Sequence, residues 1–186
     1  MVIKNKFFDV ELPVIGERIK LIAKAEEELN NKRVKIDLTR KLRGKSIDII
    51  FKITVKDKKI TAEPVRLSLL GYFIRRMIRK SANYVEDSFT GESKDSILRI
   101  KPFLITRQKV SRAIRNNLRN KTKEDITETI KNMSVEEIFT DIIFGKFQKN
   151  LSLKLKKIYP LALCEIREIF IEKSKFNQII TEEKIK

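Results

Sequence analysis

Basic side chains are the residues of this chain best suited to bind another molecule. Its 186 residues include 42 Lys and Arg against 25 Asp and Glu, a formal net charge of +17. Residues 1–123 hold 31 basic and 14 acidic side chains, whereas residues 124–186 hold 11 of each and are neutral. Repulsion among so many like charges disfavours a compact isolated protein, so the composition indicates a polyanionic partner, nucleic acid or an acidic membrane surface.

The basic residues gather in two segments that contain no carboxylate. Residues 64–85 hold five Lys and Arg, and residues 96–123 hold nine. A surface charged only for solubility mixes both signs, so this segregation predicts a phosphate-binding surface. Arginine suits that role because it grips phosphate with paired hydrogen bonds and stacks on bases. The predicted RNA-binding residues are Arg66, Arg75, Arg76, Arg79, Lys80, Arg99, Lys101, Arg107, Lys109, Arg112, Arg115 and Arg119.

Residues for catalysis or metal binding are scarce. The chain has no histidine, the commonest general base and zinc ligand. Its one cysteine, Cys164, therefore has no histidine to activate it and is interpreted as a core residue. Asp37, Asp48 and Asp57 fit better as partners of neighbouring Lys and Arg than as metal ligands. We predict no catalytic residue, no metal, no cofactor and no small-molecule substrate; a magnesium-dependent nuclease is the enzymatic alternative.

The elements that must carry the basic residues are expected to be strands over much of the chain. Pro64 indicates an edge or a bulge in one of them, and Asp57-Lys58 is an expected hairpin turn. Short strands with closely spaced turns predict an α+β fold, built on a small antiparallel β-barrel or sandwich of about six to seven strands with flanking α-helices and a helical C-terminal part. Strands are expected at 6–12, 32–38, 46–55, 59–67, 84–90 and 97–105, with β-branched and aromatic residues in partial alternation at 32–38 and 46–55. Two further segments, 19–25 and 161–171, are β-like.

Two helices are expected to carry most of the arginines that are predicted to bind RNA. The first begins with Ser68 as its N-cap and runs to about Lys80, with its apolar face toward the sheet and its basic face outward. The second is capped by Thr106 and covers 107–121, where three arginines share one face. Phosphate binding is the interpretation of both basic faces, because a solvated face would normally include a carboxylate.

The charge-neutral last third is expected to be mainly helical. Helical patterns cover 124–132 and 147–159, and a capping box formed by Ser134 and Glu137 opens a helix that Gly145 ends. We expect three regions: a basic β-barrel-like RNA-binding core with two Arg-rich helices, a charge-neutral helical part whose final strand packs on the core, and a loose tail. Their bounds are 1–123, 124–173 and 174–186.

A membrane surface is the other polyanion to consider. A basic amphipathic helix suits a membrane surface, but the chain has no Trp, and the expected strands would cover the apolar face of the helix. No apolar run approaches the roughly 18 to 20 residues that span a bilayer, and the N-terminal sequence does not fit a signal peptide. We therefore expect a cytoplasmic protein without a membrane partner.

Several segments resemble the S3Ae family of archaeal and eukaryotic small-subunit ribosomal proteins, also called eS1. They follow one consistent order from about Lys4 to Lys173. KKIYPL is the most distinctive hexapeptide, and several members have an Asp-Gly hairpin where this chain reads Glu92–Ser96. The matching segments are FKITVKDKKI (51–60), LSLLGYFIRRMIRKSANYVEDSF (67–89), LRIKPFLITRQKVSRAIRNNLR (98–119), MSVEEIFTDIIFGKFQ (133–148) and LKKIYPLALCEIREI (155–169).

The resemblance implies a structural protein of the ribosome rather than an enzyme. It implies a β-barrel-like core with flanking helices, bound to small-subunit ribosomal RNA on the platform near the messenger exit. Neighbouring ribosomal proteins of the platform, and mRNA near the exit, are the other implied partners. The chain is short and lacks the long C-terminal extension of eukaryotic members, so it resembles archaeal ones. An extra-ribosomal RNA-binding protein or a magnesium-dependent nuclease is the alternative function.

Overall fold

The computed structural model describes residues 6–42, 44–56 and 59–174. The expected hairpin turn at Asp57-Lys58 lies outside the described residues. Of the expected tail (174–186), Ser174 ends the last strand, and the rest also lies outside them.

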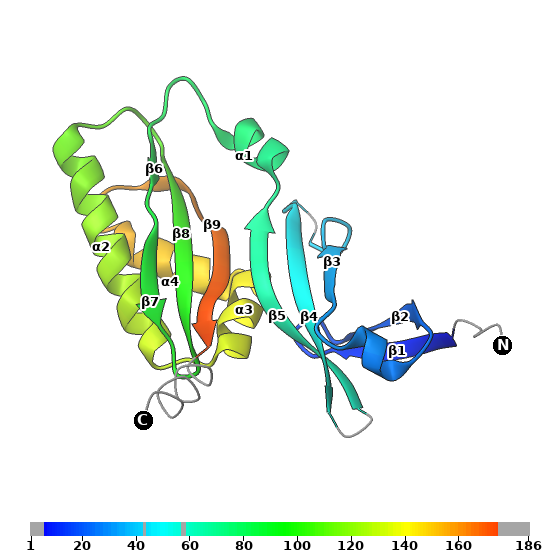
Figure 1. Ribbon diagram of the computed structural model, residues 1–186. Coiled ribbons are helices and arrows are strands. Elements are labelled where there is room, and N and C mark those ends of the chain that lie inside the picture. The colour runs from blue at the N-terminus through cyan, green and yellow to red at the C-terminus, as the bar shows by residue number, and fades with distance from the viewer. Residues whose placement is uncertain (1–5, 43, 57–58, 175–186) are drawn as a thin grey trace, which may run out of the picture.

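The described strands form one mixed sheet of nine strands that stays open (Figure 1). The α+β class with flanking helices is confirmed, although the strands exceed the expected number and the described sheet does not close into a barrel. The expected strand at 84–90 breaks at Asp87-Ser88 into two short strands, and both β-like segments, 19–25 and 161–171, form strands of the sheet. The sheet also branches, as described below. The strands are β1 (Lys6–Leu12), β2 (Glu17–Ala23), β3 (Arg33–Asp37), β4 (Ile47–Lys56), β5 (Lys59–Leu69), β6 (Tyr84–Glu86), β7 (Phe89–Glu92), β8 (Ser96–Thr106) and β9 (Leu161–Ser174).

The sheet branches at β5. Along one edge β5 pairs with β4 in antiparallel register, with a bulge beside Pro64 where the register shifts between Ile50 and Phe51. Its other edge is shared, because β1 pairs with it in parallel at Thr61 and β9 pairs with it over Arg66–Ser68. Two groups of strands therefore diverge from this point, one containing β1–β4 and the other β6–β9 (Figure 1).

One 3₁₀ turn and four α-helices accompany the sheet. They are η1 (Glu26–Leu29), α1 (Gly71–Met77), α2 (Arg112–Lys131), α3 (Val135–Phe144) and α4 (Lys146–Leu155). Helices α2, α3 and α4 pack on one another and against β7, β5 and β9, and their apolar faces close the main core. Leu118, Phe139 and Leu155 are fully buried there, beside Phe103 of β8. Helix α1 stands apart, at the end of β5 (Figure 1).

The first arginine-bearing helix begins later and ends earlier than the sequence predicts. Ser68 is not its N-cap, because β5 continues to Leu69 and Ser68 pairs with both β4 and β9. Strand pairing uses the backbone groups that a cap would need. The helix then ends at Met77, with Ile78 already extended, so Arg79 and Lys80 lie in the following loop.

The second arginine-bearing helix is one long helix rather than two. Thr106 ends β8 instead of capping the helix, and the side chain of Ser111 accepts the cap hydrogen bond from the Ile114 N–H. Helix α2 then continues through residue 123, so the expected regional boundary falls inside it. The capping box of Ser134 and Glu137 is confirmed, as is Gly145, whose φ of 77° ends α3 in the left-handed region.

Candidate nucleic-acid interface

The two carboxylate-free segments meet in space because β6 pairs with β8. Tyr84 lies opposite Ile105, and Val85 lies opposite Leu104. Next to this pairing, the fully buried hydroxyl of Thr106 accepts a hydrogen bond from the Asn83 N–H at 3.0 Å and lies 2.7 Å from the Gln108 carbonyl, to which it can donate. The Asn83 side-chain oxygen in turn accepts from the Val110 N–H at 2.8 Å. These bonds fasten the loop after α1 to the loop before α2.

The first group of cations, here called the α1 cluster, comprises Arg75, Arg76, Arg79 and Lys80. All four side chains are exposed. Phe73, which is 2% exposed, and Ile74 anchor the helix to the core, as the helical spacing predicts. The guanidinium of Arg76 lies 5.6 Å from the centre of the Phe73 ring, a cation–π contact that leaves its donors available.

The second group, here called the α2 cluster, comprises Arg107, Lys109, Arg112, Arg115 and Arg119. Arg112, Arg115 and Arg119 line one depression together with Asn116 and Tyr84. The Nε atom of Arg115 is buried and has no hydrogen-bond partner among the described residues. Arg112 is the first residue of α2, where free backbone N–H groups add positive potential.

None of these nine side chains forms an ion pair with another described residue. A cation without a carboxylate partner keeps its full charge for an external anion, and it does not have to break an internal bond first. Both clusters therefore form a positive surface at the β6 edge of the sheet.

The remaining three candidates, Arg66, Arg99 and Lys101, are paired with carboxylates on β9. Glu168 binds Arg66 through one oxygen and Lys101 through the other, at 2.6 Å from the Lys101 Nζ. Arg99 pairs with Glu172 at 3.0 Å. Both cations of the Glu168 group also contact the ring of Phe170, whose centre is 5.9 Å from the Arg66 guanidinium and 5.6 Å from the Lys101 ammonium.

The pKa of Glu168 reflects this pairing. Partial burial alone would raise it, but the hydrogen bond from Lys101 and the charge of Arg66 outweigh burial, and the pKa lies below its ordinary value. These cations were predicted to bind RNA because their own sequence neighbourhood lacks acids. The acids that neutralise them come from a strand distant in sequence, and no local pattern could reveal that.

The residues considered for catalysis are engaged elsewhere. Burial, together with the nearby charge of Glu165, raises the pKa of the Cys164 thiol to about 12, which leaves it protonated and unreactive at neutral pH. Asp48 is buried and pairs with Lys35 at 2.7 Å. Hydrogen bonds from the Thr39 side chain and backbone lower the pKa of Asp37. Asp57 lies outside the described residues.

Two features of the described part of the chain concern metal binding and membrane spanning. Within it, no group of three or more His, Cys, Asp or Glu side chains could hold a metal ion. No helix there is both long and apolar enough to cross a bilayer.

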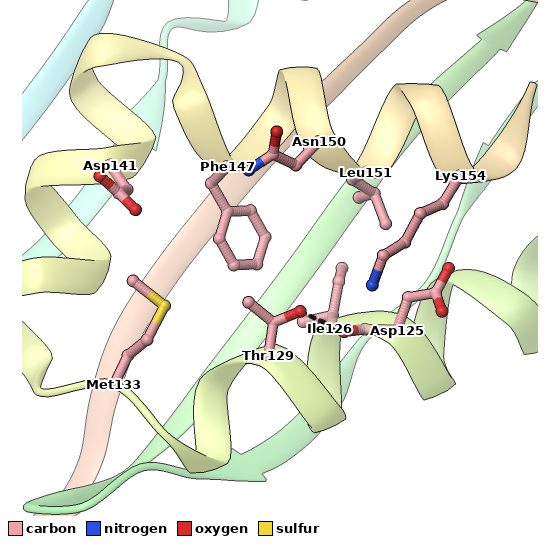
Figure 2. A pocket seen from close by; sticks show the side chains of 9 residues that line it. All are labelled: Asp125, Ile126, Thr129, Met133, Asp141, Phe147, Asn150, Leu151 and Lys154. Atoms are coloured by element: carbon pink, nitrogen blue, oxygen red, sulfur yellow. Dashed lines mark hydrogen bonds between the residues drawn. The ribbon is translucent and has the colours of Figure 1, made fainter.

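A second hollow lies on the charge-neutral side, between α2 and α4. Figure 2 shows Phe147 and Leu151 of α4 pointing toward Ile126 of α2. Asp125 and Lys154 lie toward one end of this groove, and Asp141 and Met133 toward the other (Figure 2). Asp125 is 5% exposed and pairs loosely with Lys121 at 3.6 Å. The groove thus has an apolar floor and charged ends.

Sequence reasoning missed Tyr84, although this side chain lies directly between the two clusters. It contributes to the depression with the α2 arginines and to a neighbouring one lined by Arg75 and Arg167. Its position in the sequence offered a signal, because Tyr84 is the last aromatic residue of the first carboxylate-free segment and the first residue of a strand. Its exposure depends on the tertiary structure.

Comparison with known proteins gives consistent matches. The Ribosomal S3Ae family matches residues 3–175. The small ribosomal subunit protein eS1 of Nanoarchaeum equitans is 26% identical over 174 residues, which is 89% of this chain and 88% of that protein. The eS1 protein of a Saccharolobus islandicus strain is 24% identical over 134 residues, 71% of this chain and 64% of that protein.

The family match covers nearly the whole chain, and its members are ribosomal structural proteins rather than enzymes. This confirms both the resemblance inferred from the sequence and the prediction that the chain is not an enzyme. The chain belongs to the Ribosomal S3Ae family.

Proposed function

We propose that the protein is a structural constituent of the cytoplasmic small ribosomal subunit, where it binds ribosomal RNA on the platform near the messenger exit and supports translation. The pair of exposed cation clusters, fastened together at the β6 edge, carries the proposal. The family and the names of the curated relatives support the ribosomal setting. Messenger RNA near the exit is a further partner in this proposal.

Binding is mainly electrostatic in this mechanism. The cations of both clusters neutralise backbone phosphates and release the counterions condensed on the RNA. If six to ten phosphates are contacted, the affinity falls by about 10³–10⁵ between 50 and 200 mM salt. Arg66, Arg99 and Lys101 contribute less in this scheme, because an RNA phosphate would have to compete with Glu168 and Glu172 for them.

Protein neighbours on the platform are assigned to the charge-neutral part, residues 124–173. Its groove between α2 and α4 combines an apolar floor with charged ends, a mixture that suits the centre and rim of a protein interface. Because α2 runs across residue 123, one helix belongs to both surfaces, with its basic N-terminal half toward RNA and its C-terminal half toward the groove.

Charge reversal at four positions tests the RNA surface. We expect Arg75, Arg79, Arg112 and Arg119, all replaced by Glu, to abolish binding to small-subunit ribosomal RNA in a filter-binding assay. The thermal midpoint should change little, because these side chains are exposed and unpaired within the described structure. The matched control replaces Lys146, Lys149, Lys156 and Lys157 by Glu, which changes the net charge equally but on the neutral part. Equal loss in both variants, or binding by the arginine variant, would contradict the assigned surface.

Sedimentation separates the ribosomal role from the alternatives. The wild-type protein should co-sediment with small subunits on a sucrose gradient at moderate salt, and the four-arginine variant should remain at the top. Absence of the wild-type protein from the small-subunit fractions would indicate an extra-ribosomal RNA-binding role. Magnesium-dependent RNA cleavage that is lost in Asp48→Asn would indicate the nuclease instead.

A further inference from the structure

Tyr84 presents an exposed aromatic ring in the middle of the cationic surface. Its side chain is 53% exposed, although its backbone is held in β6 opposite Ile105. The ring lies against Phe103, with the centroids 6.4 Å apart and the planes tilted by 34°. Backbone pairing and this ring contact restrict the orientation of Tyr84, so the exposed part of its ring is a prearranged apolar surface.

Cations flank the ring on two sides. The depression toward α1 contains Arg75, and the depression toward α2 contains Arg112, Arg115 and Arg119. Glu86 also lines the α1 depression, but it is paired with Arg167 at 2.8 Å, which offsets its charge. An apolar ligand alone would not need these cations, and a bare phosphate would not need the ring. A nucleotide uses both, because its base can stack while the adjoining phosphates bind arginine.

We propose that Tyr84 is the stacking platform for one unpaired nucleobase of the bound RNA. This inference rests on the proposed function, and it adds that the RNA has an unstacked nucleotide at this position. Continuous duplex cannot use the ring, because its bases are stacked and paired within the helix. Asn116, in the same depression as the α2 arginines, is placed to contact the edge of the same base or its sugar.

The test compares two hairpin RNAs of the same stem sequence, one with a single bulged uridine and one fully paired, by fluorescence anisotropy. Loss of one stacked base costs about 1–3 kcal/mol, or roughly a 5- to 150-fold loss of affinity. Tyr84→Leu should lose that factor on the bulged RNA and little on the paired RNA. Tyr84→Phe should bind both as wild type does, because the π face is retained. Phe144→Leu, at a 64% exposed aromatic residue of α3, is the control and should change neither affinity.

A hairpin RNA with a modified bulge tests the stacking role with the wild-type protein, so that the result does not depend on whether a variant folds. With an abasic nucleotide at the bulge, the wild-type protein should bind as weakly as Tyr84→Leu binds the bulged RNA, and Tyr84→Leu should lose nothing more. The slope of log affinity against log salt should be equal for wild type and Tyr84→Leu, because no phosphate contact is removed. Equal weakening on both hairpins, or no weakening, overturns the stacking role while leaving the electrostatic surface intact. Failure of the wild-type protein to bind either RNA overturns the proposed function itself.

Discussion

Glu168 neutralises two of the cations that the sequence predicted to bind RNA. Its two carboxylate oxygens bind Arg66 of β5 and Lys101 of β8, so one side chain on β9 connects three neighbouring strands. Partly exposed ion pairs usually contribute modestly to stability. In the centre of the sheet, however, Glu168 neutralises Arg66 and Lys101, two cations that would otherwise repel each other.

The lowered pKa of Glu168 makes its contribution depend on pH. Because the pKa in the folded state lies below the ordinary value of 4.5, its stabilising effect is complete above that value and is lost as the pH falls through the folded-state pKa. In urea unfolding, Glu168→Gln should be less stable than wild type at pH 7, and the difference should shrink toward pH 3. Glu11→Gln is the control, since Glu11 and its partner Arg18 are both well exposed. A difference between wild type and Glu168→Gln that does not vary with pH would contradict this role.

At the scale of elements, the junction of β6, β8 and the two arginine-bearing helices sets the spacing of the clusters. Helix α1 is short and ends in a loop, so its position depends on where that loop is held. The loop is held at Asn83 by Thr106, and Asn83 also holds the segment that leads into α2. One buried hydroxyl and one amide thus link the loops that position both helices.

Removing that hydroxyl should affect both stability and binding. Thr106→Val keeps the size of the side chain but removes the hydroxyl that bonds the part-buried Asn83 N–H and Gln108 carbonyl, a change that costs about 0.5–1.5 kcal/mol in the free energy of unfolding. The affinity for ribosomal RNA, measured well below the melting temperature, should fall as well, because the clusters lose their fixed spacing. Thr90→Val, at an exposed position of β7, should change neither quantity. Lower stability with unchanged affinity would show that the junction does not position the clusters.

At the scale of the whole molecule, uneven charge opposes the folded state in the absence of RNA. Residues 1–123 carry the entire +17, and the ion pairs with β9 neutralise Lys45 and the sheet cations but none of the residues in the two clusters. The clusters at the β6 edge retain their mutual repulsion. A cationic surface of this kind is tolerated because the apolar core, which runs from β1 to β9 through α2–α4, supplies the compensating stability.

Moderate salt should therefore stabilise the free protein. Raising the ionic strength from 0.01 to 0.1 M shortens the screening length from about 30 to about 10 Å and weakens the repulsion between the clusters. The thermal midpoint of the wild-type protein should rise over this range. The variant with four arginines replaced by Glu, whose formal charge falls from +17 by 8 to +9, should show a smaller rise. An equal rise in both proteins would mean that the clusters are not the source of the repulsion.

The sequence alone determined what depends on local pattern and composition. The capping box at Ser134 and the helix end at Gly145 follow from neighbouring residues, because each is stabilised by bonds within a few positions. Most strands and the bulge near Pro64 follow from local residue types, although their bonds are made to other strands. The net charge, its confinement to the first 123 residues and the family resemblance are likewise properties of the sequence.

Only the tertiary structure decided which basic residues are available and which aromatic residue accompanies them. Ser68 and Thr106 are residue types that commonly cap helices. Ser68 instead pairs with β9, and the buried hydroxyl of Thr106 accepts a hydrogen bond from the Asn83 N–H. The sheet cations face carboxylates of β9, and Tyr84 lies between the clusters because β6 pairs with β8. The physical reason is common to these cases: each depends on contacts between segments distant in sequence, which local spacing does not encode.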